Sequence, residues 1–141
     1  MADMKKYLSE LVDTSCDTEV ILEAIVGLVL TGVGDECVSN VIRLEFGDYV
    51  VEFYHEQDCC ESVIIDDING DFKDLVGHPL LVADERTNHG ETSFGSETWT
   101  FYTFRGVNGS VDVKWYGESN GYYSEEVYAR VLRKKNKRNT Q

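Results

Sequence analysis

Apolar and polar residues follow two different periods along this chain, and the period changes near Gly27. In residues 3–12 the apolar positions are Met4, Tyr7, Leu8, Leu11 and Val12. This spacing of three or four residues predicts a short amphipathic helix. Residues 17–25 favour a second helical segment more weakly, because the β-branched residues among them lower helix propensity.

Beyond Gly27 the apolar residues recur at every second position, which is typical of strands. Residues 38–46 and 49–55 flank Gly47-Asp48 and predict a hairpin with a two-residue turn. Further strands are predicted at residues 28–33, 62–65, 79–84, 98–104 and 111–116, a strand or helix at 122–132, and a mobile polar loop at 85–95. This order predicts an α+β fold with an N-terminal helix and a curled antiparallel sheet, in the form of a partial barrel.

The 141 residues, of which 42% are apolar, predict one folded domain. We assign this domain to residues 1–130 and interpret residues 131–141 as a flexible basic tail. No apolar run approaches the roughly 18 residues that a membrane span needs, and no apolar segment follows the N-terminal lysines. We therefore expect a cytoplasmic protein with no membrane partner.

The charge of the chain is strongly negative, with 26 acidic and 13 basic residues and a net charge of −13. Residues 1–128 hold all 26 acidic residues but only seven of the basic ones, for a charge of −19. A body of this charge repels a phosphate backbone, which argues against a nucleic-acid partner. The acid excess is open to two interpretations, namely solubility or mimicry of DNA by an inhibitor of a nucleic-acid enzyme.

Residues 55–61 bring one histidine, three acidic residues and two cysteines close together. A zinc site in this region would take its ligands from His55, Cys59, Cys60 and either Cys16 or Cys37. Alternatively, Cys59 or Cys60 is a nucleophile with His55 as its base. We favour a third interpretation, a bulge between strands with buried, reduced cysteines and no metal.

Two other segments offer groups that suit a small ligand. The strand at residues 98–104 places Trp99 on one face and Tyr102 on the other, and one of these faces is expected to join the core. The exposed face then presents an aromatic ring that can stack on a base. Residues 117–121 (GESNG) predict a turn whose backbone amides can hold an anion, and a tyrosine pair follows it.

Residues 55–63 (HEQDCCESV), 98–102 (TWTFY) and 119–125 (SNGYYSE), in this order, resemble a family of small, mostly uncharacterised bacteriophage proteins. Residues 70–81 resemble the same family. Among phage anti-defence proteins, the chain is similar to the first type of Thoeris anti-defence signal sponge. This resemblance implies a small multimeric α+β protein that binds cyclic ADP-ribose isomers made by bacterial TIR-domain enzymes and holds them without cleaving them.

The resemblance therefore implies a non-enzymatic phage protein of the host cytoplasm, with a cyclic nucleotide as its ligand and no cofactor. We expect arginines to hold the phosphates, an amide to read the adenine edge, an aromatic ring to stack on the base, and a neighbouring subunit to complete the pocket. The candidate residues are Arg86, Asn88, Trp99, Tyr102, Arg105, Tyr122, Tyr123 and Arg130. The apolar face of the N-terminal helix is expected to join the subunits of a homo-oligomer.

Two other classes of function compete with this interpretation. The first is an acidic inhibitor that binds a host nuclease, of the anti-CRISPR or DNA-mimic type, and it would bind no small ligand. The second is a hydrolase built on cysteine and histidine, which would turn its substrate over. Release of intact ligand, release of product or absence of ligand after heat denaturation separates the three.

Overall fold

The computed structural model describes residues 7–13, 17–34 and 40–134 of the chain. The helices are α1 (Leu8–Leu11), α2 (Thr18–Ile25) and the short 3-10 helix η1 (Phe72–Leu75). The strands are β1 (Gly32–Val33), β2 (Ile42–Phe46), β3 (Tyr49–Tyr54), β4 (Ser62–Asn69), β5 (Val82–Glu91), β6 (Ser96–Arg105), β7 (Ser110–Ser119) and β8 (Tyr128–Arg133).

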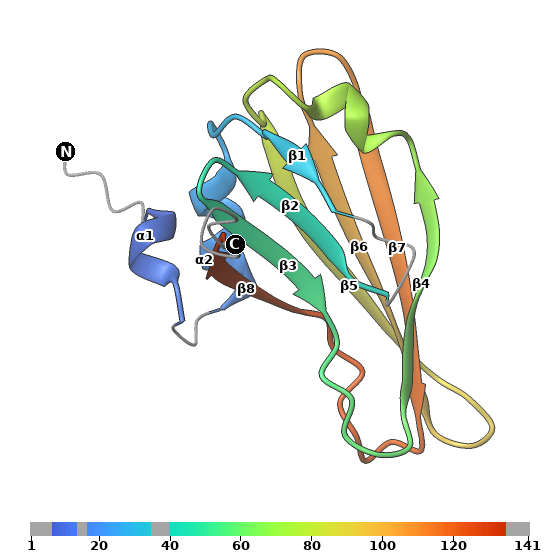
Figure 1. The fold of residues 1–141 in the computed structure, drawn as a ribbon. Coiled ribbons are helices and arrows are strands. Elements are labelled where there is room, and N and C mark those ends of the chain that lie inside the picture. Colours follow the sequence, from blue (N-terminus) through green and yellow to red (C-terminus); the bar gives the residue numbers. More distant parts are fainter. Residues whose placement is uncertain (1–6, 14–16, 35–39, 135–141) are drawn as a thin grey trace, which may run out of the picture.

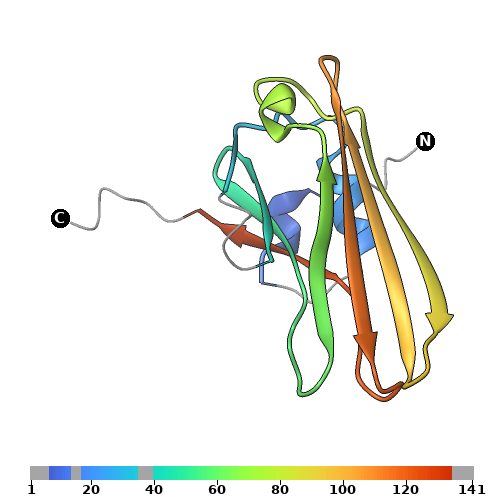
Figure 2. The same cartoon turned by 90° about the vertical axis from the view of Figure 1, so that its right-hand side faces the viewer.

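The strands form two four-stranded antiparallel sheets, with the orders β1-β2-β3-β8 and β4-β7-β6-β5. The long strands of the second sheet make a tall layer, and the shorter first sheet lies against one face of it (Figures 1 and 2). The α+β, mainly antiparallel prediction is therefore confirmed. The partial barrel is not, because the strands divide between two separate sheets.

The core lies between the two sheets, where the inner faces of their strands meet. Along β6 every second residue is buried, and Tyr102 and Phe104 point inward at 1% exposure each. Phe53 of β3 packs against them from the other sheet, with ring centroids 4.9 Å and 5.5 Å away. The two-residue period of β6 thus turns Tyr102 and Phe104 towards β3, whose residues 50–53 are all buried, and this contact holds the sheets together.

The helices cover the side of the molecule where both sheets end. The α2 helix packs against β5 and β8, which are the edge strands of their sheets. Leu8 and Leu11 of α1 are only 4% exposed and belong to the same core. Leu8 and Leu11 of the predicted apolar face are therefore covered by their own chain and are not free for a subunit interface, whereas Tyr7 is 62% exposed. Met4 lies outside the described residues.

Some boundaries differ from those predicted, and the β2–β3 hairpin is confirmed. Gly47 takes the positive φ of 66° that its two-residue turn requires. Residues 85–91, expected in a mobile loop, instead belong to β5, whose polar side chains suit an edge strand with both faces solvated. Residues 131–133, expected in the tail, belong to β8, and the amide of Lys134 donates to the Asp48 carbonyl.

No helix in the described part of the chain is long and apolar enough to span a membrane.

Candidate functional site

The outer face of the long sheet carries two adjacent rows of aromatic and cationic side chains. The register of β5, β6 and β7 aligns Arg86, Phe101 and Lys114 in one row. It aligns Asn88, Trp99 and Tyr116 in the next row. We call these six residues the aromatic face.

The side chains of the aromatic face contact one another across the strands. The rings of Trp99 and Tyr116 lie 4.3 Å apart, and Lys114 Nζ lies 5.2 Å from the centre of the Trp99 ring. The Arg86 guanidinium lies 5.4 Å from the centre of the Phe101 ring. The rings are half-buried, so a flat ligand can still reach them. Lys114 also forms an ion pair with Asp66 at 3.3 Å, which leaves Arg86 as the cation of the two rows without an ion pair in the described part of the chain.

Acidic residues border the aromatic face at both ends. Asp84, Thr103 and Asp112 form the row beyond Arg86, with Thr103 Oγ1 donating to Asp112 at 2.7 Å. On the other side, Tyr116 donates its hydroxyl to Glu97 and Glu118, and these hydrogen bonds raise the pKa of the tyrosine. The positive charge is therefore confined to the two rows between the acids.

The structure brings together three of the residues predicted from the sequence, namely Arg86, Asn88 and Trp99. Tyr102 is on the opposite side of β6, where it is 1% exposed and donates its hydroxyl to Glu85 at 2.7 Å. Its prediction as a stacking residue is wrong, because the strand alternation turns it into the core. Arg105 is exposed, but it lies about 20 Å along β6 from Trp99, beyond the acidic row.

The remaining predicted residues lie elsewhere. Tyr122 and Tyr123 are in the β7–β8 loop, and the Tyr122 side chain is 82% exposed. Arg130 of β8 lines a cleft on the other side of the long sheet. Its guanidinium is occupied by Glu52, at 2.8 Å and 2.9 Å, and stacks over the Tyr54 ring. Arg130 is therefore not available to complete the aromatic face.

Phe101, Lys114 and Tyr116 were missed as site residues by the sequence reasoning. Each lies on the exposed side of a strand that the two-residue period predicts correctly. The two-residue period shared by residues 98–104 and 111–116 could have indicated these residues as exposed, but it does not show how the two strands pair. Only the pairing of β6 with β7 places Lys114 beside Phe101 and Tyr116 beside Trp99.

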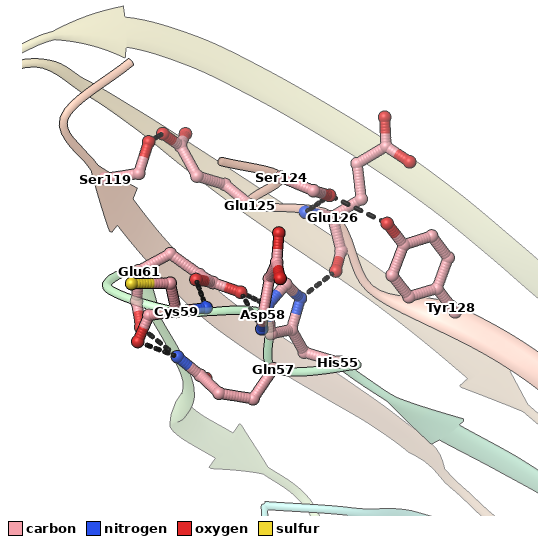
Figure 3. Close-up of polar contacts among 10 residues, drawn as sticks. All are labelled: His55, Gln57, Asp58, Cys59, Glu61, Ser119, Ser124, Glu125, Glu126 and Tyr128. Carbon is pink, nitrogen blue, oxygen red and sulfur yellow. Dashed lines mark hydrogen bonds and ion pairs between the residues drawn. The ribbon is translucent and has the colours of Figure 1, made fainter. Parts of the chain in front are cut away.

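The segments that carry the family resemblance meet in a polar network at the tip of the molecule (Figure 3). His55 joins the first segment to the residue that follows the third, since Nδ1 lies 2.7 Å from the Glu126 carbonyl and Nε2 lies 2.8 Å from Glu61 Oε2. Glu61 also accepts hydrogen bonds from the amides of Asp58 and Cys59. Burial raises the pKa of Glu61, but the hydrogen bonds from Cys59, His55 and Asp58 outweigh it and lower this pKa to about 2.

A second carboxylate anchors the same tip. Glu125 is 8% exposed and accepts hydrogen bonds from three hydroxyls, those of Ser96 at 2.5 Å, Thr98 at 2.8 Å and Ser119 at 2.5 Å. Burial raises the pKa of Glu125, and these three hydroxyls together with the charge of His89 lower it further than burial raises it. The polar residues of the motifs thus fix the loops at the ends of β3, β6 and β7.

Cys59 and Cys60 are joined in a disulfide between adjacent residues, and both are exposed. The expectation of a buried, reduced pair is wrong, because the pair lies on the surface of the loop that Glu61 holds from inside. Both ring nitrogens of His55 already contact other groups, so His55 is unavailable as a base for these sulfurs. Cys16 and Cys37 lie outside the described residues.

The fold is that of a two-sheet α+β protein with the aromatic face on the outer side of its longer sheet. The chain belongs to the family described as a domain of unknown function (DUF7448), whose model matches residues 35–129. This match covers every strand except β1 and the last residues of β8. No curated protein and no solved structure matches the chain.

Proposed function

We propose that the chain is a non-catalytic binding protein that sequesters a cyclic nucleotide, of the cyclic ADP-ribose type, on its aromatic face. In this proposal a bacteriophage produces it in the host cytoplasm, where it withholds an immune signal from the Thoeris defence without cleaving it. It acts as a homo-oligomer. The observation that carries the proposal is the alignment of aromatic rings, two cations and an amide in adjacent rows.

Each part of the aromatic face matches one part of a nucleotide. The Trp99 and Tyr116 rings offer a surface on which a base stacks. Arg86 and Lys114 offer charge for the phosphates in the neighbouring row. Arg86 makes no ion pair in the described part of the chain, whereas Lys114 pairs with Asp66 at 3.3 Å and would have to exchange this partner for a phosphate. Asn88, opposite Trp99, can donate to and accept from an adenine edge.

The acidic borders favour a small ligand over a nucleic-acid strand. Neighbouring rows on one face of a sheet are about 7 Å apart, so two rows accommodate a base and its adjoining phosphates. A strand that continued past these rows would bring its phosphates against Asp84 and Asp112 or against Glu97 and Glu118. Like charges at these positions would repel it.

Calorimetry with a cyclic ADP-ribose isomer tests the proposal. We expect Trp99→Ala and Arg86→Ala each to weaken binding about tenfold or more, because each removes a stacking surface or a charged hydrogen bond. Arg105→Ala is the matched control, since it removes an exposed arginine from the same sheet face outside the two rows. Ligand recovered after heat denaturation is expected to be intact.

Three results would contradict the proposal. Equal binding by the parent protein and Trp99→Ala would place the ligand elsewhere. Recovery of a cleaved product would make the protein an enzyme. A loss with Arg105→Ala as large as that with Arg86→Ala would show that general charge, and not the aromatic face, holds the ligand.

A further inference from the structure

A cleft of about 1030 Å³ lies on the inner side of the long sheet, between the ends of β5 and β6, strand β8 and the start of α2. From β5 and β6 only alternate residues line it, which are Glu85, Thr87, His89, Thr98 and Thr100. By contrast, every residue from 126 to 132 lines the cleft; residues 126 and 127 precede β8, and the others belong to it. Since neighbouring residues of a strand point to opposite faces, this unbroken run means that the edge of β8 itself faces the cleft.

The backbone of β8 supports this orientation. The strand pairs with β3 on one side, and on its other side Val131 forms a parallel bridge with Val12 and accepts a hydrogen bond from the Asp13 amide at 3.4 Å. In an antiparallel pair, residues that turn their N–H and C=O groups away from the neighbour occur at every second position. Ala129 therefore presents its backbone groups to the cleft, on the part of the edge that lies before the Val12–Val131 bridge and where another chain can pair.

The cleft is strongly acidic. Its carboxyl groups belong to Asp13, Asp17, Glu19, Glu56, Glu85 and Glu126. The one arginine in its lining, Arg130, is already paired with Glu52. Burial raises the pKa of Glu85, and the charges of Glu126 and Glu19 raise it further; together they outweigh the hydrogen bond from the Tyr102 hydroxyl, which lowers it.

A hydroxyl group in the cleft independently indicates a ligand. Thr100 is 2% exposed and lines the cleft, and its Oγ1 makes no hydrogen bond to any of the residues that the structure describes. Among the described residues Trp115 Nε1, and not this oxygen, is the side-chain atom that is fully buried without a partner, so the Thr100 hydroxyl opens onto the cleft, where an entering group can bond to it. Within the described ranges no three histidine, cysteine or acidic side chains are arranged to hold a metal ion, so the spread of charge fits an extended cation.

We propose that this cleft binds an extended basic polypeptide segment, and that its occupant is residues 135–141 of a second copy of the chain. This segment contains Lys135, Lys137 and Arg138 and no acidic residue. Its charge complements the cleft, and its backbone can pair with the edge of β8. The occupant comes from a second copy because the Lys134 amide binds Asp48 and its ammonium pairs with Glu45, on the β3 side of β8 and away from the cleft.

Calorimetry with a synthetic peptide of residues 135–141 tests this proposal on a protein that ends at Lys134. We expect the peptide to bind, and the double variant Glu85→Gln with Glu126→Gln to bind it about tenfold more weakly. The matched control is Glu23→Gln with Glu91→Gln, which makes the same change in net charge at exposed positions outside the cleft. A peptide with the same charges but methylated backbone nitrogens is expected to bind more weakly than the unmodified peptide.

Light scattering on the full chain provides the second measurement. We expect the mass of an oligomer for the full chain and of a monomer for the protein that ends at Lys134, at equal concentration. A peptide that does not bind, or that the control variant weakens as much as the cleft variant does, overturns the proposal. A full chain that stays monomeric contradicts the second copy as the occupant. Equal binding of the methylated and the unmodified peptide contradicts the pairing with the edge of β8. None of these results depends on the aromatic face, so its nucleotide binding stands or fails separately.

Discussion

The tip and the cleft are two regions that hold carboxylates in opposite ways. At the tip, the oxygens of Glu61 and Glu125 meet backbone amides, hydroxyls and an imidazole, and the pKa of each group is lowered. In the cleft, burial and the charges of Glu126 and Glu19 raise the pKa of Glu85, although the Tyr102 hydroxyl donates to it. A carboxylate whose hydrogen bonds lower its pKa builds the fold, whereas one whose pKa is raised is expected where a ligand supplies positive charge.

The largest expected effect tests the structural half of this comparison. Glu125→Ala leaves the hydroxyls of Ser96, Thr98 and Ser119 without their acceptor, and we expect it to lower the free energy of unfolding by about 3 kcal/mol. Glu126→Ala is the matched control, because the adjacent side chain is exposed in the cleft. Urea denaturation of both variants measures the difference. Equal losses of stability in Glu125→Ala and Glu126→Ala would show that the carboxylates of the tip do not stabilise the fold more than those of the cleft.

An effect of intermediate size is expected from the pH dependence of Glu61. Its pKa is about 2 in the folded chain and 4.5 when unperturbed, so the ionised form stabilises the folded state. This contribution is complete above pH 4.5 and is lost as the pH falls towards 2. We expect Glu61→Gln to be less stable than the parent at neutral pH and to lose less stability across this acid range. Urea midpoints measured at several pH values check this, and parallel curves for both proteins would contradict it.

The smallest effect on stability is expected in the cleft, where removing a carboxylate stabilises the fold at neutral pH, whereas at the tip it destabilises the fold. Because the folded-state pKa of Glu85 is raised, its stabilising contribution is present below pH 4.5 and is lost as the pH rises through the folded-state value. Glu85→Gln keeps an acceptor for the Tyr102 hydroxyl without the charge. We expect this variant to be slightly more stable than the parent at pH 7 and equal to it below pH 4.5. Thermal denaturation at both pH values measures this, and a destabilised variant at pH 7 would show that the cleft tolerates the charge.

Local sequence patterns predicted the elements better than the site. The period of residues 98–104 predicted β6 and its two faces, and Gly47-Asp48 predicted the β2–β3 turn. The same period left open which face of β6 is buried, so Trp99 and Tyr102 were both expected at one site. Residues 85–91 were taken for a loop because an edge strand with two solvated faces shows no apolar alternation.

The sequence by itself determined the α+β class, the main strands, the acidic body and the tight β2–β3 turn. These features depend on side-chain period, charge and turn chemistry among residues close together in the chain. The tertiary structure alone decided that Arg86 and Lys114 flank Phe101, that His55 joins Glu61 to the Glu126 carbonyl, and that the edge of β8 faces six carboxyl groups. Those arrangements depend on register and sheet packing between segments far apart in the chain, and a local pattern contains no information about which distant strand will be its neighbour.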